Sequence, residues 1–241
     1  MMKVKPVTAP PWINALHSRP STSFSGTPML DRKIPFPAFA LLFMVAGATD
    51  ALIYLHSRDL LAVYMTGNSS HIGRHIGEGD WAGIAPLAAI IAAFFGATTL
   101  GAWIGMRVGR WRPTVILVLA ALSMSVAMPF AHGEEYPFIT VLFIASSMGV
   151  LNQVSGNESG VTFLTGMMIR TGRAFAQGDF RAGLDGLLRW CALVAGAALA
   201  IPLNTHMGAR ALLVIAAMLA LGAVFTLWNA LVGRHRARHS T

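Results

Sequence analysis

The sequence predicts an all-α integral membrane protein, with six transmembrane helices arranged as two inverted three-helix repeats. The first observation is composition, because 55% of the 241 residues are hydrophobic and only 12% are charged. That balance excludes both a disordered chain and an ordinary soluble domain. The second observation is a set of apolar runs that approach or exceed the ~20 residues a helix needs to cross a bilayer. The third is an internal repeat, in which one polar segment between apolar runs occurs twice.

Six apolar segments are interpreted as membrane spans. They are residues 36–55, 82–106, 113–131, 136–152, 187–204 and 211–232, and the fourth is short. Together they predict a single transmembrane domain over residues 35–232. Residues 1–34 are rich in Pro, Ser and Thr and predict a disordered basic tail, and residues 233–241 predict a second basic tail.

The distribution of Lys and Arg predicts the orientation. With six crossings and the N-terminus inside, the cytoplasmic segments hold 15 of these residues and the outer segments hold three. Cytoplasmic loops carry the excess of positive charge, so both termini are predicted to be cytoplasmic, in a bacterial inner membrane. Eight crossings would place Arg107, Arg110 and Arg112 outside, and we reject that version. The net charge of +8 is thereby explained without a nucleic-acid partner.

Residues 64–81 align with residues 163–180 without a gap. Similarity extends to "GATD" at residues 47–50 and "GVLN" at residues 149–152, so the halves cover about 36–131 and 136–232. Because three spans is an odd number, the second half is predicted to be inverted relative to the first. The identical pairs within the repeated segment are Thr66/Thr165, Gly67/Gly166, Gly73/Gly172, Arg74/Arg173, Gly79/Gly178 and Asp80/Asp179.

Four pieces of sequence carry a resemblance to a known family. They are "VAGATDAL", "MTGNSSHIG", "MGVLNQ" and "TFLTGMM", and "MTGN" is the most specific of them. Over about residues 36–232 the chain resembles the YoaK-like family of bacterial multi-pass membrane proteins, a family of unknown function. The resemblance implies a multi-pass membrane fold and a membrane location, and it implies no substrate.

Inverted repeats are a common architecture of transporters, whose binding site lies near the bilayer midplane between the halves. We therefore expect a small-solute transporter or permease whose substrate contacts come from both halves. A carboxylate inside an apolar run should face the bundle interior or a water cavity, so Asp50 could bind a proton or a cation. A hydrogen-bonded structural role is the alternative for that residue. The candidate binding residues are Asp50, Thr66, Gly67, Asn68, Asn152, Gln153, Thr165 and Gly166.

The Thr-Gly elements predict two short helices, over residues 69–78 and 167–177. Glycine lets the backbone unwind before each helix, and Thr or Asn could cap it. The exposed amide groups of a helix N-terminus suit an anion or a substrate carbonyl. Two capped helices that bind no ligand are the alternative interpretation.

A second group of repeated residues is predicted to be structural. Glycine ends each short helix in a left-handed cap and aspartate caps the helix that follows. The repeated arginine of each copy is expected to pair with the neighbouring aspartate or to reach lipid headgroups. These residues are Gly79, Asp80, Gly178, Asp179, Arg74 and Arg173.

Other chemistry has weaker support. His71, His75 and Glu78 could place three metal ligands on one helical face, but the second copy lacks them, so a solvated face is favoured and no metal is expected. The motifs of common enzymes are missing from the sequence, so neither catalysis nor a cofactor is expected. The expected partners are the bilayer and a small solute, with a homo-oligomer left open. A non-transporting membrane regulator or assembly partner is the rival function, and an intramembrane enzyme comes third.

Overall fold

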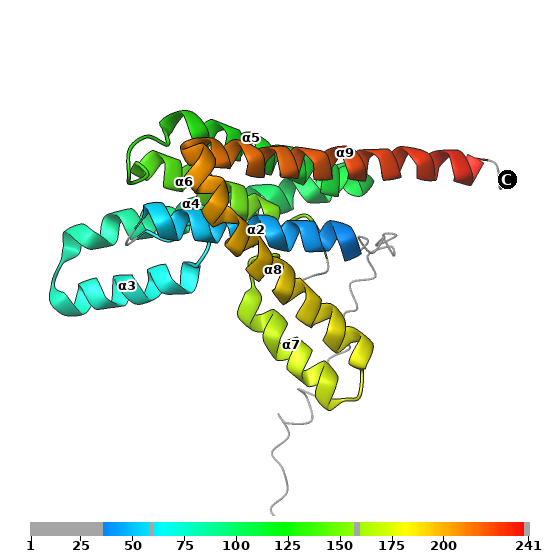
Figure 1. Ribbon diagram of the computed structural model, residues 1–241, viewed down its shortest axis with the longest axis horizontal. Coiled ribbons are helices and arrows are strands. Elements are labelled where there is room, and N and C mark those ends of the chain that lie inside the picture. Colours follow the sequence, from blue (N-terminus) through cyan, green and yellow to red (C-terminus); the bar gives the residue numbers. More distant parts are fainter. Residues whose placement is uncertain (1–35, 58–59, 157–159, 239–241) are drawn as a thin grey trace, which may run out of the picture. The chain divides into compact units, whose positions relative to one another are not determined.

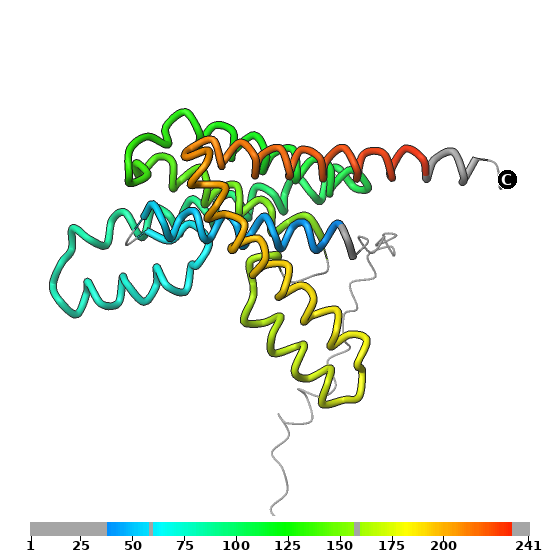
Figure 2. Tube along the Cα trace, in the orientation of Figure 1, coloured from blue at the N-terminus to red at the C-terminus, as the bar shows by residue number. Residues whose placement is uncertain are grey.

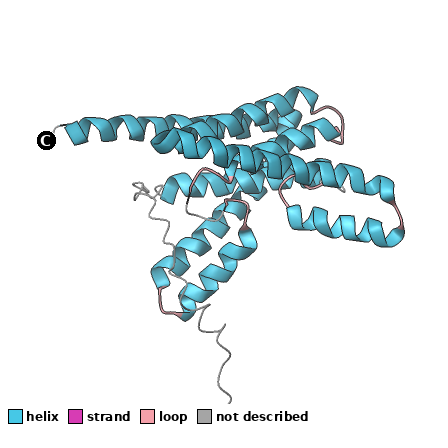
Figure 3. Ribbon diagram, turned by 180° about the vertical axis from the view of Figure 1, so that it is seen from behind, coloured by secondary structure: helices cyan, strands magenta, loops and turns pink. Residues whose placement is uncertain are grey.

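The computed structural model describes residues 36–57, 60–156 and 160–238, and every regular element in these ranges is a helix (Figures 1 and 3). Three apolar helical stretches are long enough to cross a membrane: residues 38–56, 81–130 and 180–232. The second and third contain 50 and 53 residues, and each holds two successive helices. These features confirm the prediction of an all-helical membrane protein. The predicted tail at residues 1–34 lies outside the described residues.

The helices follow the predicted spans, with a few shifted boundaries (Figure 2). Predicted to begin at residue 187, α8 begins seven residues earlier, and α9 continues beyond its predicted end at residue 232. In chain order the elements are α2 (Phe36–His56), α3 (Met65–Glu78), α4 (Trp81–Val108), η1 (Gly109–Trp111), α5 (Arg112–Ala127), η2 (Met128–Phe130), α6 (Phe138–Leu151), α7 (Leu164–Ala176), α8 (Phe180–Met207), η3 (Gly208–Arg210) and α9 (Ala211–Arg238).

Two helical hairpins form where the repeated segment lies, because α3 folds back on α4 and α7 folds back on α8 (Figure 1). Both turns use the same geometry. Gly79 and Gly178 have φ of 72° and 78°, a left-handed conformation that glycine adopts without a Cβ penalty. The carboxylates of Asp80 and Asp179 then accept the amides of Gly83 and Ala182 in the first turn of the next helix, at 3.2 and 3.0 Å.

Close backbone contact joins α2 to α8, and the two helices run in the same direction. A Cβ added at Gly196 would meet the backbone of Met44, so only glycine allows this approach. Near the C-terminal ends of the same two helices, His56 Nε2 lies 2.8 Å from Asn204 Oδ1. Because both contacts advance along both helices, the pair is parallel.

An equivalent pair forms between α4 and α6. A Cβ added at Gly149 would meet the carbonyl of Phe94, and the Thr98 hydroxyl donates to the Gly149 carbonyl at 3.0 Å. One turn further on, Gly101 faces the Gln153 side chain. This pair also runs in parallel.

The last long pair, α5 and α9, runs in opposite directions. The hydroxyls of Thr114 and Thr226 lie 2.9 Å apart, and Leu117 contacts α9 at Gly222, one turn closer to its beginning. The fully buried side chains of the bundle include Leu52, Ile116, Met148 and Ile215.

Large apolar side chains also cover much of the outer surface of the long helices. Trp81, Phe95 and Trp228 are 72%, 70% and 67% exposed. A water-soluble protein rarely leaves apolar patches of this extent uncovered. Such a surface is expected where acyl chains of lipid surround the helices.

Candidate functional site

The first Thr-Gly element lies inside a helix, which corrects the predicted start at residue 69. The helix α3 begins at Met65, its N-cap is Tyr64, and no side chain caps it. Thr66 therefore occupies the first turn and is exposed, so it cannot serve as the predicted cap. The aromatic ring of Tyr64 packs over Gly67, where a Cβ would collide with it. The glycine accommodates this ring, and the backbone does not unwind there.

The second element repeats this geometry, and the predicted start at residue 167 is also corrected. The helix α7 begins at Leu164 with Phe163 as its N-cap, again without a side-chain cap. Thr165 is exposed in the first turn, and Gly166 lies under the ring of Phe163. In both copies an aromatic residue before the helix covers a glycine of its first turn.

Asn68 is fully buried and fastens the loop that leads into α3. Its Nδ2 donates to the Leu61 carbonyl at 2.6 Å, while its Oδ1 accepts the Leu61 amide at 3.1 Å. The side-chain amide thus pairs with one backbone residue as a second peptide group would. Because a buried polar group needs such partners, Asn68 explains why this loop can be buried.

Asn152 fastens the loop after α6 through equivalent side-chain hydrogen bonds. Its Oδ1 accepts the Thr162 amide at 3.0 Å, and its Nδ2 donates to the Thr162 hydroxyl at 2.8 Å and to the Met148 carbonyl at 3.1 Å. A Cβ added at Gly160 would collide with the same side chain. The side-chain bonds of Asn152 are therefore made within its own half.

Gln153, the next residue, contacts the opposite half. The Arg112 guanidinium at the start of α5 donates from Nε to the Gln153 carbonyl at 2.8 Å, and from Nη2 to Gln153 Oε1 at 3.2 Å. The guanidinium also packs over Gly105 of α4. This cluster connects the end of α6 to the junction between α4 and α5.

Asp50 lies in α2, about one turn beyond Gly47, where an added Cβ would meet the backbone of Leu193 in α8. The residue is half-buried, and its neighbour Thr49 is completely buried and bonded to the Val45 carbonyl at 2.8 Å. Its position inside an apolar span makes the carboxylate chemically distinctive, since a charged group there is costly unless it meets water or a partner.

The structure does not assemble the eight candidate residues into one polar site. The hydrogen bonds of Asn68 and of Asn152 stay within separate loops, and Thr66 and Thr165 face outward from two different hairpins. The side-chain amides of Asn68 and Asn152, which the sequence offers as solute ligands, are hydrogen-bonded to their own loops.

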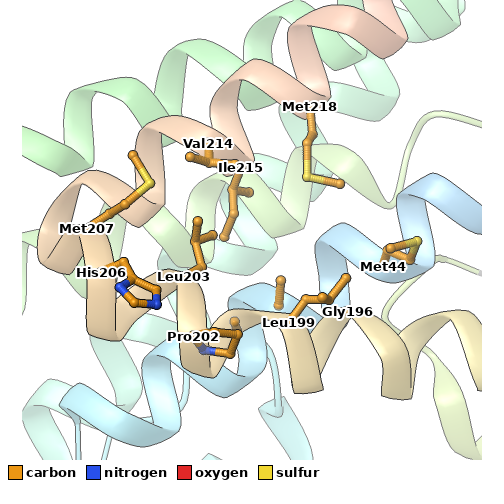
Figure 4. A pocket seen from close by; sticks show the side chains of 12 residues that line it. Met44, Gly196, Leu199, Pro202, Leu203, His206, Met207, Val214, Ile215 and Met218 are labelled. Carbon is orange, nitrogen blue, oxygen red and sulfur yellow. The ribbon is translucent and has the colours of Figure 1, made fainter.

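One cavity lies between α2, α8 and α9 and has a volume of about 400 Å³ (Figure 4). Its lining is apolar apart from His206 near the end of α8. None of the candidate residues lines it. A second apolar cavity, of about 290 Å³, lies between α2, α5 and α9. The lining of the larger cavity is Met44, Ala48, Gly196, Leu199, Ala200, Pro202, Leu203, His206, Met207, Val214, Ile215 and Met218.

A polar cluster around His56 was not predicted from the sequence. The ring of His56 lies between two oxygen atoms, the Glu134 carbonyl 2.7 Å from Nδ1 and Asn204 Oδ1 2.8 Å from Nε2, and it stacks on Tyr136 at 4.3 Å. A carbonyl can only accept, so Nδ1 donates to Glu134, and Nε2 can then accept a hydrogen bond from Asn204 when the side-chain amide of Asn204 turns its NH₂ group toward the ring. Through this ring the end of α2 is joined to α8 and to the linker between the halves.

The turn between α3 and α4 includes charged groups whose pairing differs from the prediction. Asp80 accepts a hydrogen bond from His75 Nδ1 at 2.8 Å, while Arg74 lies 4.0 Å from Glu78. The bond from the Gly83 amide lowers the pKa of Asp80 below its ordinary value, and His75 adds to that effect. Among the residues described, no group of three His, Cys, Asp or Glu side chains is arranged to hold a metal ion.

Long apolar helices with exposed aromatic and aliphatic side chains define the class of this chain as a helical integral membrane protein. The family model described as "Protein of unknown function (DUF1275)" matches residues 38–225, so the chain belongs to that family. A UPF0700 transmembrane protein of Rhizobium meliloti (strain 1021) is 26% identical over 198 residues, which are 77% of this chain and 84% of that protein. These matches confirm the resemblance to a multi-pass membrane family of unknown function. No solved structure matches the chain.

Proposed function

We propose that the chain is a small-solute transporter or permease of the bacterial inner membrane, built from two inverted halves that cross the bilayer three times each. In this proposal both termini are cytoplasmic, as the distribution of Lys and Arg predicts. The halves exchange conformations and expose a central site first to one face and then to the other.

The observation that carries the proposal is the direction in which the helices pair. Two halves related by inversion require the first span of each half to run parallel to the second span of the other. The parallel pairs α2–α8 and α4–α6 satisfy that requirement, and the antiparallel pair α5–α9 joins the third spans. Six crossings with a cytoplasmic N-terminus give the same directions.

Close backbone contacts at glycines lie where helices of the two halves cross, and in this proposal the halves move relative to each other there. At Gly47 and Gly149 the partner backbone lies so close that a Cβ would collide with it, at Leu193 and Phe94 respectively. These two partners are 99 positions apart, the spacing of the repeat. Smooth backbone contacts without interlocking side chains favour a change of crossing angle between the helices.

Hydrogen bonds join the halves at two opposite ends of these pairs. His56 to Asn204 closes the end that is predicted to face outward, and Arg112 to Gln153 closes the end predicted to face the cytoplasm. Alternate opening would break one of these contacts while the other persists. Asp50 lies six residues before His56 on α2, and in this proposal it binds a proton or a cationic solute.

A non-transporting regulator or assembly partner is the second candidate, and one observation favours it. Both cavities are lined by apolar groups, whereas a path for a polar solute needs polar groups along it. A regulator would require no such path. Ligand binding by the purified protein separates the two functions.

The inverted arrangement can be tested by labelling cysteines from one side of the membrane. Ser70→Cys places an exposed thiol on α3, and Gln177→Cys places one directly after α7, in a chain whose exposed Cys191 is replaced by alanine. A maleimide that cannot cross membranes should label position 70 in intact spheroplasts, and position 177 only after lysis. Labelling of both positions from the same side would exclude the inverted halves and with them the proposed transporter.

Transport itself needs a bound solute. A thermal-shift screen of small solutes on purified protein should find a ligand, since a ligand at 100 times its Kd stabilises the folded state by about 2.7 kcal/mol. In proteoliposomes, Asp50→Asn should abolish proton-coupled uptake of that ligand while the protein remains folded. Unchanged uptake and unchanged pH response would remove Asp50 from the mechanism.

A further inference from the structure

The hairpins α3–α4 and α7–α8 share a backbone but expose different chemistry. On α7, Met168 and Ile169 are 54% and 57% exposed. The equivalent positions on α3, 99 residues earlier, are the exposed serines Ser69 and Ser70. The side of α7 that contacts α8 carries Thr171 at Gly186 and Phe175 at Gly183. At about 100° per residue, Ile169 lies about 160° from Thr171 and points away from α8, while Met168 lies about 60° from it, at the border of the contact. The exposed side of α7 is therefore apolar where that of α3 is polar.

Charge differs between the same two hairpins. Arg173 on α7 and Arg181 on the first turn of α8 are both exposed, and Arg170 is exposed on α7 as well. The acidic Glu78, which lies beside Arg74 on α3, corresponds to the neutral Gln177, the residue after the end of α7. Neutral Ala82 of α4 corresponds to Arg181. The second hairpin thus gains positive charge relative to its copy, while its number of carboxylates stays at two, because Asp185 of α8, which pairs with Arg189 at 2.7 Å, stands where α4 has Pro86.

At 100° per residue, the basic and apolar positions of α7 occupy adjacent faces. Met168, Ile169 and Ala176 fall on one exposed arc, and Arg170 and Arg173 fall on the next. An exposed apolar face bordered by arginines is the pattern of a helix that lies at a membrane surface, with apolar groups in the acyl region and cations among the headgroups. The copy on α3 lacks this pattern, so the shared backbone does not account for it.

We propose that the α7–α8 hairpin binds anionic phospholipid headgroups, through Arg170, Arg173 and Arg181, with Met168 and Ile169 inserted beneath them. The occupant is a lipid because the apolar face adjoins the cationic one, and a soluble anion would use only the arginines. The positive charge matches the anionic surface of a cytoplasmic leaflet, the side on which this hairpin is predicted to lie. This proposal does not depend on transport.

The test uses the full-length protein reconstituted in nanodiscs of phosphatidylcholine, with and without phosphatidylglycerol. Bound phosphatidylglycerol, counted by native mass spectrometry across a lipid titration, should fall about 30-fold in affinity in R173Q/R181Q, since each interfacial cation contributes about a factor of five to six. R74Q on α3 is the matched control and should bind as the wild type does. R173K/R181K keeps the charge and should retain binding.

Two further measurements identify the occupant. M168S/I169S should weaken phosphatidylglycerol binding without changing the response to inorganic phosphate, which lacks an acyl chain. Equal affinity for both lipids in the wild type, or the same loss in R74Q as in R173Q/R181Q, would overturn the proposal. Weak lipid binding together with tight binding of an acidic peptide would assign the surface to a protein partner and would also overturn it. Thermal melting in phosphatidylcholine alone verifies that each variant is folded.

Discussion

The two halves fasten the loop before their hairpin by different means. In the first half, Asn68 reaches back from α3 to bond the backbone of Leu61. In the second half the anchor comes from the other side, since Asn152 at the end of α6 reaches forward to Thr162. The turns at the tips of the hairpins are nevertheless the same. What the fold requires is a closed, satisfied loop, and either flanking helix can supply the amide.

Substitution at the helix crossings should have the largest effect, and it should be similar in the two halves. Gly47→Leu and Gly149→Leu each place a side chain against a partner backbone that cannot move aside. Overpacking typically destabilises by about 1–3 kcal/mol, occasionally by more, and a collision with backbone should lie at the upper end of that range. Unfolding titrations with SDS in mixed micelles should show a comparable loss for both variants. A loss in only one of them would indicate that the two crossings are not equivalent.

Two glycines on the exposed sides of the hairpins provide the control. Nothing lies within 4 Å of a Cβ added at Gly73 or at Gly172. Gly73→Ala and Gly172→Ala should therefore stabilise each hairpin by about 0.5–1 kcal/mol, through higher helix propensity alone. Destabilisation by either alanine would contradict the exposed position of its helix face.

The loop anchors should come second in effect. Asn68→Ala leaves the amide and carbonyl of Leu61 without their partner, and Asn152→Ala leaves the amide and hydroxyl of Thr162 without theirs. Each loss should cost about 1–3 kcal/mol, the penalty for an unsatisfied buried polar group. Thr66→Ala and Thr165→Ala are neighbouring exposed controls and should change stability little.

Amide exchange separates the two anchors. In Asn68→Ala the protection of the Leu61 amide should be lost while the loop at Thr162 keeps its protection, and Asn152→Ala should give the reverse result. Simultaneous loss in both loops would contradict the local character of each anchor.

The sequence predicts the features that depend on local rules. The length of the apolar runs predicts the long helices. The Gly-Asp pairs predict the two hairpin turns, because a left-handed glycine and the aspartate cap that follows it are adjacent in the sequence. The starts of α3 and α7 were predicted wrongly, since neither Tyr64 nor Phe163 is a side-chain cap. Propensity rules expect Ser, Thr, Asp or Asn at that position.

Contacts between residues far apart in the chain could not be predicted from the sequence. His56 and Asn204 lie 148 positions apart, and both are common residue types near helix ends, so no pattern marks them as a pair. Asn68 and Asn152 are predicted to contact a solute, and the sequence does not show that each of them also bonds the loop beside it. The charge distribution predicts that Arg112 lies at the cytoplasmic end of a membrane span. It does not predict the hydrogen bonds between Arg112 and Gln153.

The contact between the halves at His56 should have a smaller effect than either anchor. His56→Phe keeps the stacking on Tyr136 and removes the bond to Asn204, and water can replace the bond to the exposed Glu134 carbonyl. The expected loss is about 1 kcal/mol, the net value of one hydrogen bond. In a double-mutant cycle, Asn204→Ala in the His56→Phe background should add nothing further. Full additivity would show that the two side chains do not interact.

The smallest expected effect distinguishes the two otherwise equivalent turns. Asp80 accepts a bond from His75 as well as from the Gly83 amide, whereas Ala174 stands where a second histidine would be in the copy at Asp179. Asp80→Asn should therefore lower the melting temperature more than Asp179→Asn does. Because the folded state lowers the pKa of Asp80, its stabilisation is present above the ordinary pKa of an aspartate and disappears as pH falls through the lowered value. The difference in melting temperature between wild type and Asp80→Asn should be present at pH 5 and should narrow as the pH falls below the ordinary aspartate pKa of ~3.9, closing only below the lowered pKa of Asp80. A difference that does not narrow at all below the ordinary pKa would mean that the carboxylate charge of Asp80 does not stabilise the turn.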